Sequence, residues 1–152
     1  MSAAGEPLVL LPGMNCSEQL WEPVVAEPAL AGPGRPDVLR PPLRGRSVDA
    51  CVDRLLEGLP PRFALAGLSL GAIVALALVR RAPERVSRLA LLAVNARAPR
   101  PDQQAAWAAQ RRALAQGGTA RSLQEQLLPV LLAEHRRAAH PLTEPALSPA
   151  TR

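Results

Sequence analysis

Apolar and polar positions alternate between two patterns along the first hundred residues. Short apolar runs occupy residues 7–12, 63–66 and 88–94, with a weaker run at 37–40, and such runs are typical of strands buried on both faces of a parallel sheet. Residues 47–59 carry apolar side chains at helical spacing, and residues 72–82 form an apolar helix ended by Pro83. The pattern predicts an α/β fold, a parallel sheet with helices on both faces.

The chain changes character after residue 101. Residues 102–116 predict a polar, alanine-rich helix that Gly117 and Gly118 end, and residues 122–137 predict another helix, which Pro129 should bend. Residues 141–152 are rich in proline and predict no regular structure. We therefore expect three parts: a core over residues 1–101, helices over residues 102–140 and an unstructured tail over residues 141–152.

Composition excludes several classes of protein. The charged side chains are 18 basic and 13 acidic, for a net charge of +5. Every basic residue is an arginine, but the arginines are scattered and aromatics make up only 2% of the chain, so we expect no nucleic-acid partner. No apolar run is long enough to cross a membrane, and the first residues lack the basic flank of a secretory signal. We expect a cytoplasmic protein without a membrane partner.

Both cysteines are expected to be chemically inert. Cys51 falls on the apolar stripe of the helix predicted at residues 47–59, and Cys16 falls in a turn after the first strand. Two cysteines in a chain of 152 residues do not make a disulfide scaffold. We therefore expect reduced, structural thiols and no metal site or cofactor.

The sequence Gly67-Leu68-Ser69-Leu70-Gly71 matches the nucleophile elbow. In that motif a serine sits on a sharp turn between a strand and a helix, which exposes its hydroxyl at the carboxyl end of the sheet. The apolar runs before and after the motif supply that strand and that helix. Gly67 and Gly71 are then needed where a side chain would collide with neighbouring backbone. The alternative is a plain glycine-rich turn without catalytic function.

A second loop can complete such a site. An oxyanion hole uses the amide of the residue after the nucleophile, here Leu70, and an amide from a loop after an earlier strand. Met14 follows the first predicted strand and is placed to supply that amide. The alternative is an ordinary turn that ends the strand.

Residues 7–100 resemble the α/β-hydrolase fold family, of the alpha/beta hydrolase-1 type. The resemblance rests on the first strand and its turn, on the elbow, and on the helix and strand that follow it. It implies a parallel sheet ordered second, first, third, fourth, with Ser69 as the nucleophile and residues 102–137 as the start of a cap. Pro12 stands where the family has a histidine. Serine at the elbow resembles esterases, thioesterases, lactonases and C–C hydrolases, whereas dehalogenases and epoxide hydrolases carry aspartate.

The rest of a catalytic triad is not evident. In the family an acid and a histidine follow two later strands, and this resemblance implies an N-terminal part of the fold without them. The two histidines are His135, on the apolar stripe of a predicted helix, and His140, in the proline-rich tail. We interpret both as structural or solvated side chains. Glu84, Asp102, Glu125 and Glu134 lie between Ser69 and His135, and we interpret all four as surface charges.

Three hypotheses about function follow. The first is a serine hydrolase for a small ester, thioester or lactone, impaired because the acid and histidine are absent. The second is a truncated, non-catalytic remnant that serves as a binding module. The third is an interaction protein that completes its sheet with a partner. The fourth predicted strand, from Arg88 to Val94, would present Leu89, Leu91 and Leu92 on an open edge, so we expect possible self-association there.

Overall fold

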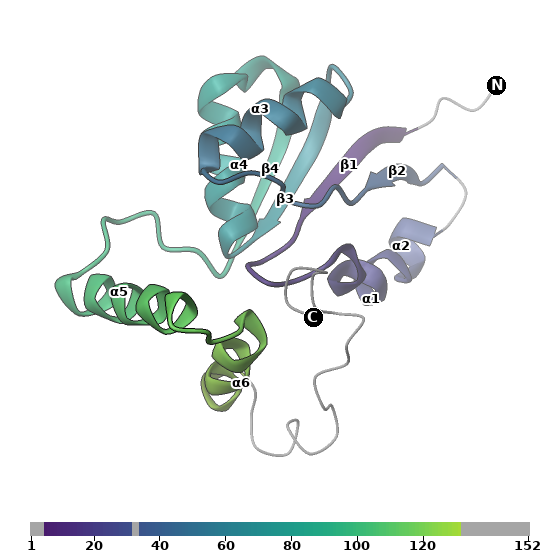
Figure 1. Ribbon diagram of the computed structural model, residues 1–152. Helices are drawn as coiled ribbons and strands as arrows, with labels where there is room; N and C mark the ends of the chain where they lie inside the picture. Colours follow the sequence, from purple (N-terminus) through teal and green to yellow (C-terminus); the bar gives the residue numbers. More distant parts are fainter. Residues whose placement is uncertain (1–4, 32–33, 132–152) are drawn as a thin grey trace. The chain divides into compact units, whose positions relative to one another are not determined.

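A computed structural model of the chain describes residues 5–31 and 34–131 (Figure 1). The chain divides into two units, Met1–Asn95 and Ala96–Arg152.

The first unit is built on a parallel sheet. Within the described residues it has four strands, β1 (Gly5–Leu11), β2 (Pro36–Leu39), β3 (Phe63–Leu68) and β4 (Val86–Leu92), in the order β2-β1-β3-β4. Every neighbouring pair is parallel. This confirms the predicted strand order and the predicted fold class. Because all four strands run the same way, their carboxyl ends lie at one edge of the sheet.

Helices connect successive strands. In chain order they are the 3-10 turn η1 (Glu18–Trp21), α1 (Glu22–Val25), α2 (Pro28–Ala31), α3 (Val48–Gly58), α4 (Leu70–Arg81) and the 3-10 turn η2 (Pro83–Arg85). Two serines cap the starts of helices: Ser17 accepts a hydrogen bond from the Gln19 amide, and Ser47 accepts one from the Ala50 amide at 3.1 Å.

Two layers of side chains hold the sheet. Val9 and Leu11 of β1 pack with Phe63 and Leu65 of β3 against α3 and α4. Alternate positions point to the opposite face, where Leu10 packs with the buried Trp21. The continuous apolar runs of β1 and β3 are thus explained, because each strand buries side chains on both faces.

β4 is covered less well than the central strands β1 and β3. Leu89, Leu91 and Leu92 remain 41%, 38% and 41% exposed. Within the described part of the chain β4 pairs with β3 alone. These leucines were predicted to lie on an open edge, and β4 is an edge strand of the described sheet.

The second unit contains two described helices, α5 (Pro101–Ala115) and α6 (Ala120–Leu131). Every side chain of α5 is at least partly exposed, and Trp107 is 52% exposed. Thr119 and Ser122 exchange hydrogen bonds at the start of α6, with each amide donating to the other's hydroxyl. Pro129 lies inside α6 as predicted. The predicted helix end at residue 137 and the tail at residues 141–152 lie outside the described residues. None of the described helices combines the length and the apolar character needed to cross a membrane.

Candidate active site

The backbone of Ser69 makes the sharp turn between β3 and α4. Its φ of 52° and ψ of −111° fall where side-chain-bearing residues are rare. The neighbouring strand β4 holds this turn, because the Ser69 amide donates to the Leu92 carbonyl of β4 at 2.9 Å. The following helix holds it too, because the Ser69 carbonyl accepts from the Ala72 amide at 3.0 Å. The Ser69 side chain is exposed as a result.

The two elbow glycines leave no room for a side chain. A Cβ on Gly67 would lie 2.6 Å from the Ala72 amide nitrogen, and a Cβ on Gly71 would lie 2.6 Å from the Pro12 carbonyl oxygen. Real Cβ atoms essentially never come so close, and the neighbours are backbone atoms that cannot swing away. Each glycine therefore allows a close approach: Gly67 lets α4 start against β3, and Gly71 lets α4 pack on the end of β1.

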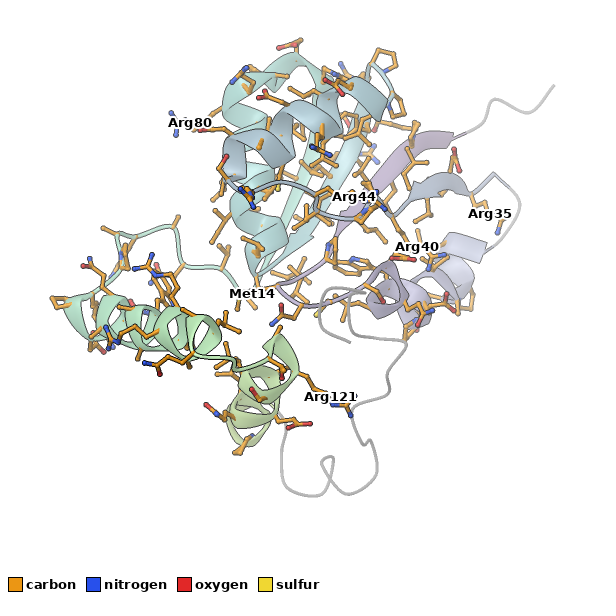
Figure 2. All side chains as sticks on the ribbon, viewed as in Figure 1. Met14, Arg35, Arg40, Arg44, Arg80 and Arg121 are labelled. Atoms are coloured by element: carbon orange, nitrogen blue, oxygen red, sulfur yellow. The ribbon has the colours of Figure 1, made fainter. Side chains whose placement is uncertain are left out.

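The turn after β1 lies against the elbow. A Cβ built on Gly13 would lie in ordinary contact with the Leu68 carbonyl oxygen, at 3.7 Å. Cys16 closes this turn by donating its amide to the Gly13 carbonyl at 3.2 Å. Figure 2 labels Met14 at the end of β1, and its side chain is 51% exposed. The structure thus brings the turn after β1 beside the elbow, while the roles of Met14, Ser69 and Leu70 stay a prediction.

Two backbone amides at this edge have no hydrogen-bond acceptor among the described residues. Within residues 5–31 and 34–131, the structure shows no hydrogen bond donated by the amide of Met14 or of Leu70. Leu70 is the first residue of α4, where backbone amides carry the positive end of the helix dipole. Unpaired amides beside an exposed hydroxyl are suited to stabilise negative charge on an oxygen atom.

No described side chain is positioned to activate the Ser69 hydroxyl. The described residues contain no histidine, since His135 and His140 both lie outside them. Asp102 pairs with Arg100 and Glu125 pairs with Arg121. Arg100 lowers the pKa of Asp102 through their hydrogen bond. Both acids are therefore engaged within the second unit.

The remaining acids and the two cysteines considered from the sequence differ in how deeply they are buried. Glu84 is exposed, and Glu134 lies outside the described residues. Cys51 is buried and Cys16 is partly buried, and burial raises the pKa of both thiols. A raised pKa leaves less thiolate at neutral pH, so both thiols are poor nucleophiles. Among the described residues no group of three His, Cys, Asp or Glu side chains is arranged to hold a metal ion.

One contact of the elbow was missed by sequence reasoning. The Leu92 carbonyl, which receives the Ser69 amide, lies at the end of β4, and the next residue, Ala93, has a positive φ of 50°. Neither leucine nor alanine carries a sequence signal for such a role. The hydrogen bond follows from the parallel register, in which Leu68 pairs with Leu92.

Known proteins resemble this chain in sequence and in fold. No family model matches the chain. The pimeloyl-[acyl-carrier protein] methyl ester esterase of Aromatoleum aromaticum is 38% identical over 97 residues, which cover 58% of this chain and 37% of that esterase. The fold recurs in solved structures: a thioesterase domain from the curacin biosynthetic pathway matches with a TM-score of 0.57 at 22% identity. The chain has the α/β-hydrolase fold.

The solved structures that share this fold are named for different chemistries. A loop variant of haloalkane dehalogenase from Bradyrhizobium elkanii matches this α/β-hydrolase chain with a TM-score of 0.55 at 18% identity. The matches cover 90% of this chain for the dehalogenase and 88% for the thioesterase domain, but only 56% and 57% of those two structures. The chain thus spans little more than half of each solved structure and about a third of the esterase. These solved structures establish the fold, while the chemistry must be argued from the site.

Proposed function

We propose that this α/β-hydrolase chain contributes the nucleophile and the oxyanion hole of a serine hydrolase for a small ester, thioester or lactone. The observation that carries the proposal is the left-handed backbone of Ser69, which exposes its side chain between two glycines that tolerate no Cβ. Such strain persists only where surrounding structure enforces it, and it gathers at functional sites.

The proposed reaction has two halves. Ser69 Oγ attacks the carbonyl carbon of the substrate and loses its proton, and the negative charge that forms on the carbonyl oxygen is stabilised by the amides of Met14 and Leu70. The carbonyl re-forms, the bond to the leaving alcohol or thiol breaks, and that group takes up a proton. Water then attacks the acyl-enzyme, releases the carboxylic acid and returns the proton to Ser69.

The class of substrate is supported by two features. Serine at the elbow suits acyl transfer, because its oxygen can form and release an ester. The relative in Aromatoleum aromaticum is named for cleavage of a methyl ester, which favours an ester for this chain as well. We propose that the product is a carboxylic acid and an alcohol or thiol.

We further propose that the chain by itself reacts slowly. A serine hydroxyl without a general base is a weak nucleophile, and no described residue hydrogen-bonds to the Ser69 hydroxyl. The oxyanion hole and binding alone still give roughly 10³–10⁴-fold catalysis over water. The same unpartnered hydroxyl favours a second candidate function, a non-catalytic module that binds an acyl compound at the elbow.

Labelling with a fluorophosphonate probe tests the proposal. The full chain should be labelled slowly, and Ser69→Ala should abolish the labelling, whereas Ser122→Ala in the second unit should leave it unchanged. Labelling that persists in Ser69→Ala would exclude Ser69 as the nucleophile. Rapid stoichiometric labelling would contradict the missing base and point to His135. Complete absence of labelling, together with binding of an acyl compound, would favour the binding module.

A further inference from the structure

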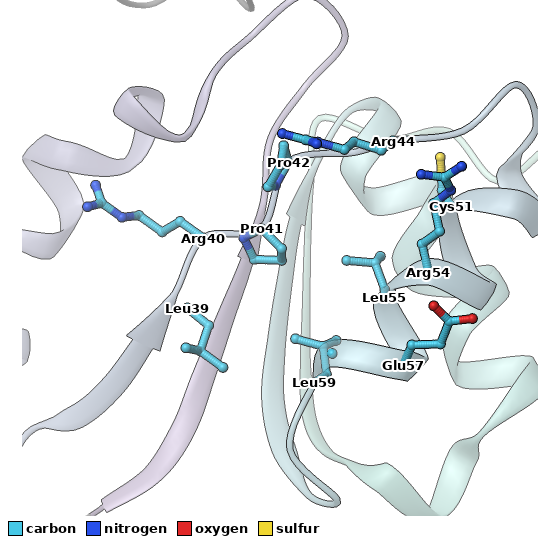
Figure 3. Close-up of a pocket in the computed structure, with 11 residues that line it drawn as sticks. Leu39, Arg40, Pro41, Pro42, Arg44, Cys51, Arg54, Leu55, Glu57 and Leu59 are labelled. Carbon is cyan, nitrogen blue, oxygen red and sulfur yellow. The ribbon is translucent and has the colours of Figure 1, made fainter.

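A second cavity opens between β2 and α3. Its volume is about 590 Å³, which lies within the range of small-molecule sites. Its wall comes from the end of β2, from the loop that follows and from one side of α3 (Figure 3). None of the elbow or oxyanion-hole residues lines it. Whatever it binds is therefore held apart from Ser69.

The rim of this cavity is cationic. Figure 3 shows the Arg54 guanidinium beside Cys51, whereas Arg44, also on the cavity wall, points its guanidinium away from Cys51 and over Pro42. Within the described part of the chain, neither guanidinium has an ion-pair or hydrogen-bond partner. The acid next to Arg54 in the sequence, Asp53, is instead paired with Arg81 at 3.1 Å. Two exposed guanidinium groups thus remain available to an anion.

The other charged groups of the wall do not pair with these two arginines. Arg40 pairs with Glu22 of α1 at 3.3 Å and is turned toward it. Glu57 lies one turn of α3 beyond Arg54, and Figure 3 shows its carboxylate below Arg54, pointing away from Leu59. No hydrogen bond joins Glu57 to either arginine among the described residues. Within the described residues the wall thus carries two cations without an ion-pair partner, Arg54 on α3 and Arg44 on the loop after β2.

The remainder of the cavity is apolar. Leu39, Leu55 and Leu59 line it together with Pro41 and Pro42. Leu55 is buried and belongs to the packed layer between α3 and the sheet, so this part of the wall is fixed. A rigid apolar wall beside two free guanidinium groups is complementary to a molecule that has an apolar body and an anionic head.

We propose that this cavity binds an amphipathic anion, a short alkyl or acyl chain that ends in a carboxylate or a phosphate. The chain lies along Leu39, Leu55 and Leu59, and the oxyanion accepts hydrogen bonds from Arg44 and Arg54. Guanidinium groups suit both head groups, because each offers paired oxygens to the planar fork of N–H donors. The site is independent of the proposed hydrolase reaction at Ser69.

Titration of the isotope-labelled full chain, followed by amide NMR, tests this proposal. The probes are octanoate, octyl phosphate and the uncharged octanol. Octanoate and octyl phosphate should shift the amides of Leu39, Leu55 and Leu59 in a saturable way, and octanol should bind about tenfold more weakly or worse. The anion that binds more tightly identifies the preferred head group. Equal affinities for octanoate and octyl phosphate would indicate that the site accepts either oxyanion.

Matched charge variants locate the head group. Arg44→Gln and Arg54→Gln should each weaken octanoate binding by about tenfold, and each should reduce the advantage over octanol. Arg80→Gln on α4 removes the same charge away from the cavity and should leave affinity unchanged. Ser69→Ala should also leave it unchanged, so a failed hydrolase proposal would not affect this result. Added salt should weaken the binding of the two anions and leave the binding of octanol unchanged.

Three results would overturn the proposal. Equal binding of octanol and octanoate would show that the arginines recognise no head group. An equal loss of affinity in Arg80→Gln would show an effect of net charge alone. Saturable shifts at Leu89 and Ala90, with none at Leu55, would place the alkyl chain on the exposed part of the sheet instead.

Discussion

Ser69 combines an unfavourable backbone with an exposed hydroxyl. A residue held in such a sparsely populated region costs of order 1–3 kcal/mol, and the hydrogen bonds to Leu92 and from Ala72 keep it there. Glycine adopts a positive φ freely. We therefore expect Ser69→Gly to be more stable than Ser69→Ala by about 1 kcal/mol.

Thermal or urea unfolding of these two variants measures the difference. Ser69→Ala keeps a Cβ and removes only the hydroxyl, so it serves as the control. Equal stability would show that the turn at Ser69 carries no strain. Both variants should lose fluorophosphonate labelling, because neither retains the nucleophile.

Gly71 is the second residue on which the elbow depends. A Cβ there would meet the backbone of Leu11 and Pro12, which cannot move without shifting β1. We expect Gly71→Ala to destabilise the chain by about 3 kcal/mol, at the upper end of the cost of overpacking. Chemical denaturation with tryptophan fluorescence as the readout measures this, since Trp21 is buried against the same sheet.

Gly58 provides the matched control. It ends α3, and a Cβ there would meet nothing within 4 Å. Gly58→Ala should leave stability unchanged or raise it by up to about 1 kcal/mol, because alanine favours a helix more than glycine does. If Gly71→Ala changed the free energy of unfolding as little as Gly58→Ala, the close contact that we infer between α4 and β1 would be contradicted.

The elbow residues could be predicted from the sequence because the motif requires particular residue types at fixed spacing. Gly67, Ser69 and Gly71 are recognisable by spacing, and the structure gives each glycine a steric reason. The unpartnered pair Arg44 and Arg54 could not be found in this way. Ten residues separate them in the chain, and arginine is so common in this sequence that no spacing marks the pair.

At the scale of elements, Arg85 connects three of them. Its guanidinium donates to the carbonyls of Leu56, Leu59 and Pro60 at 3.0, 2.6 and 2.7 Å, where α3 ends. The same group lies 5.8 Å from the centre of the Phe63 ring of β3. Cations near a helix C-terminus compensate the unpaired carbonyls there. Arg85 thus fixes α3 against η2 and the start of β3.

We expect Arg85→Met to lower the free energy of unfolding by about 2–3 kcal/mol, because several charge-assisted hydrogen bonds are lost from a partly buried group. Methionine preserves much of the apolar stem. Arg80→Met on α4 is the control and should change stability little, since Arg80 is exposed. Urea denaturation checks both, and similar small effects in the two variants would contradict the role of Arg85.

Element positions were predicted well where the apolar pattern is continuous and less well at their ends. β3 runs to Leu68 and α4 begins at Leu70, whereas the sequence suggested a longer glycine-containing turn between them. The structure replaces that turn with Ser69 alone, because the close contacts at Gly67 and Gly71 allow strand and helix to meet directly. The short α2 went unpredicted, since its four residues carry too few positions for a helical period.

At the scale of the molecule, the two faces of the sheet differ in how they are filled. One face packs long side chains of α3 and α4 against Val9, Leu11 and Leu65. The other face carries the small side chains of Ala64, Ala66 and Ala90 beside a cavity of about 420 Å³. The strand order was predictable from the family resemblance. This uneven coverage was not, because it depends on which side chains meet across neighbouring strands.

The outer edge of β4 is apolar and exposed. Exposed apolar strand edges recruit other chains unless a charge or a proline interrupts them, and Leu89, Leu91 and Leu92 are all exposed. We therefore expect the chain to self-associate at micromolar concentration, as measured by sedimentation. Leu91→Lys should shift the distribution toward monomer, whereas Leu114→Lys, at an exposed leucine of α5, should not. A monomer with a cooperative, reversible melt in the unaltered chain would show that this edge is already protected.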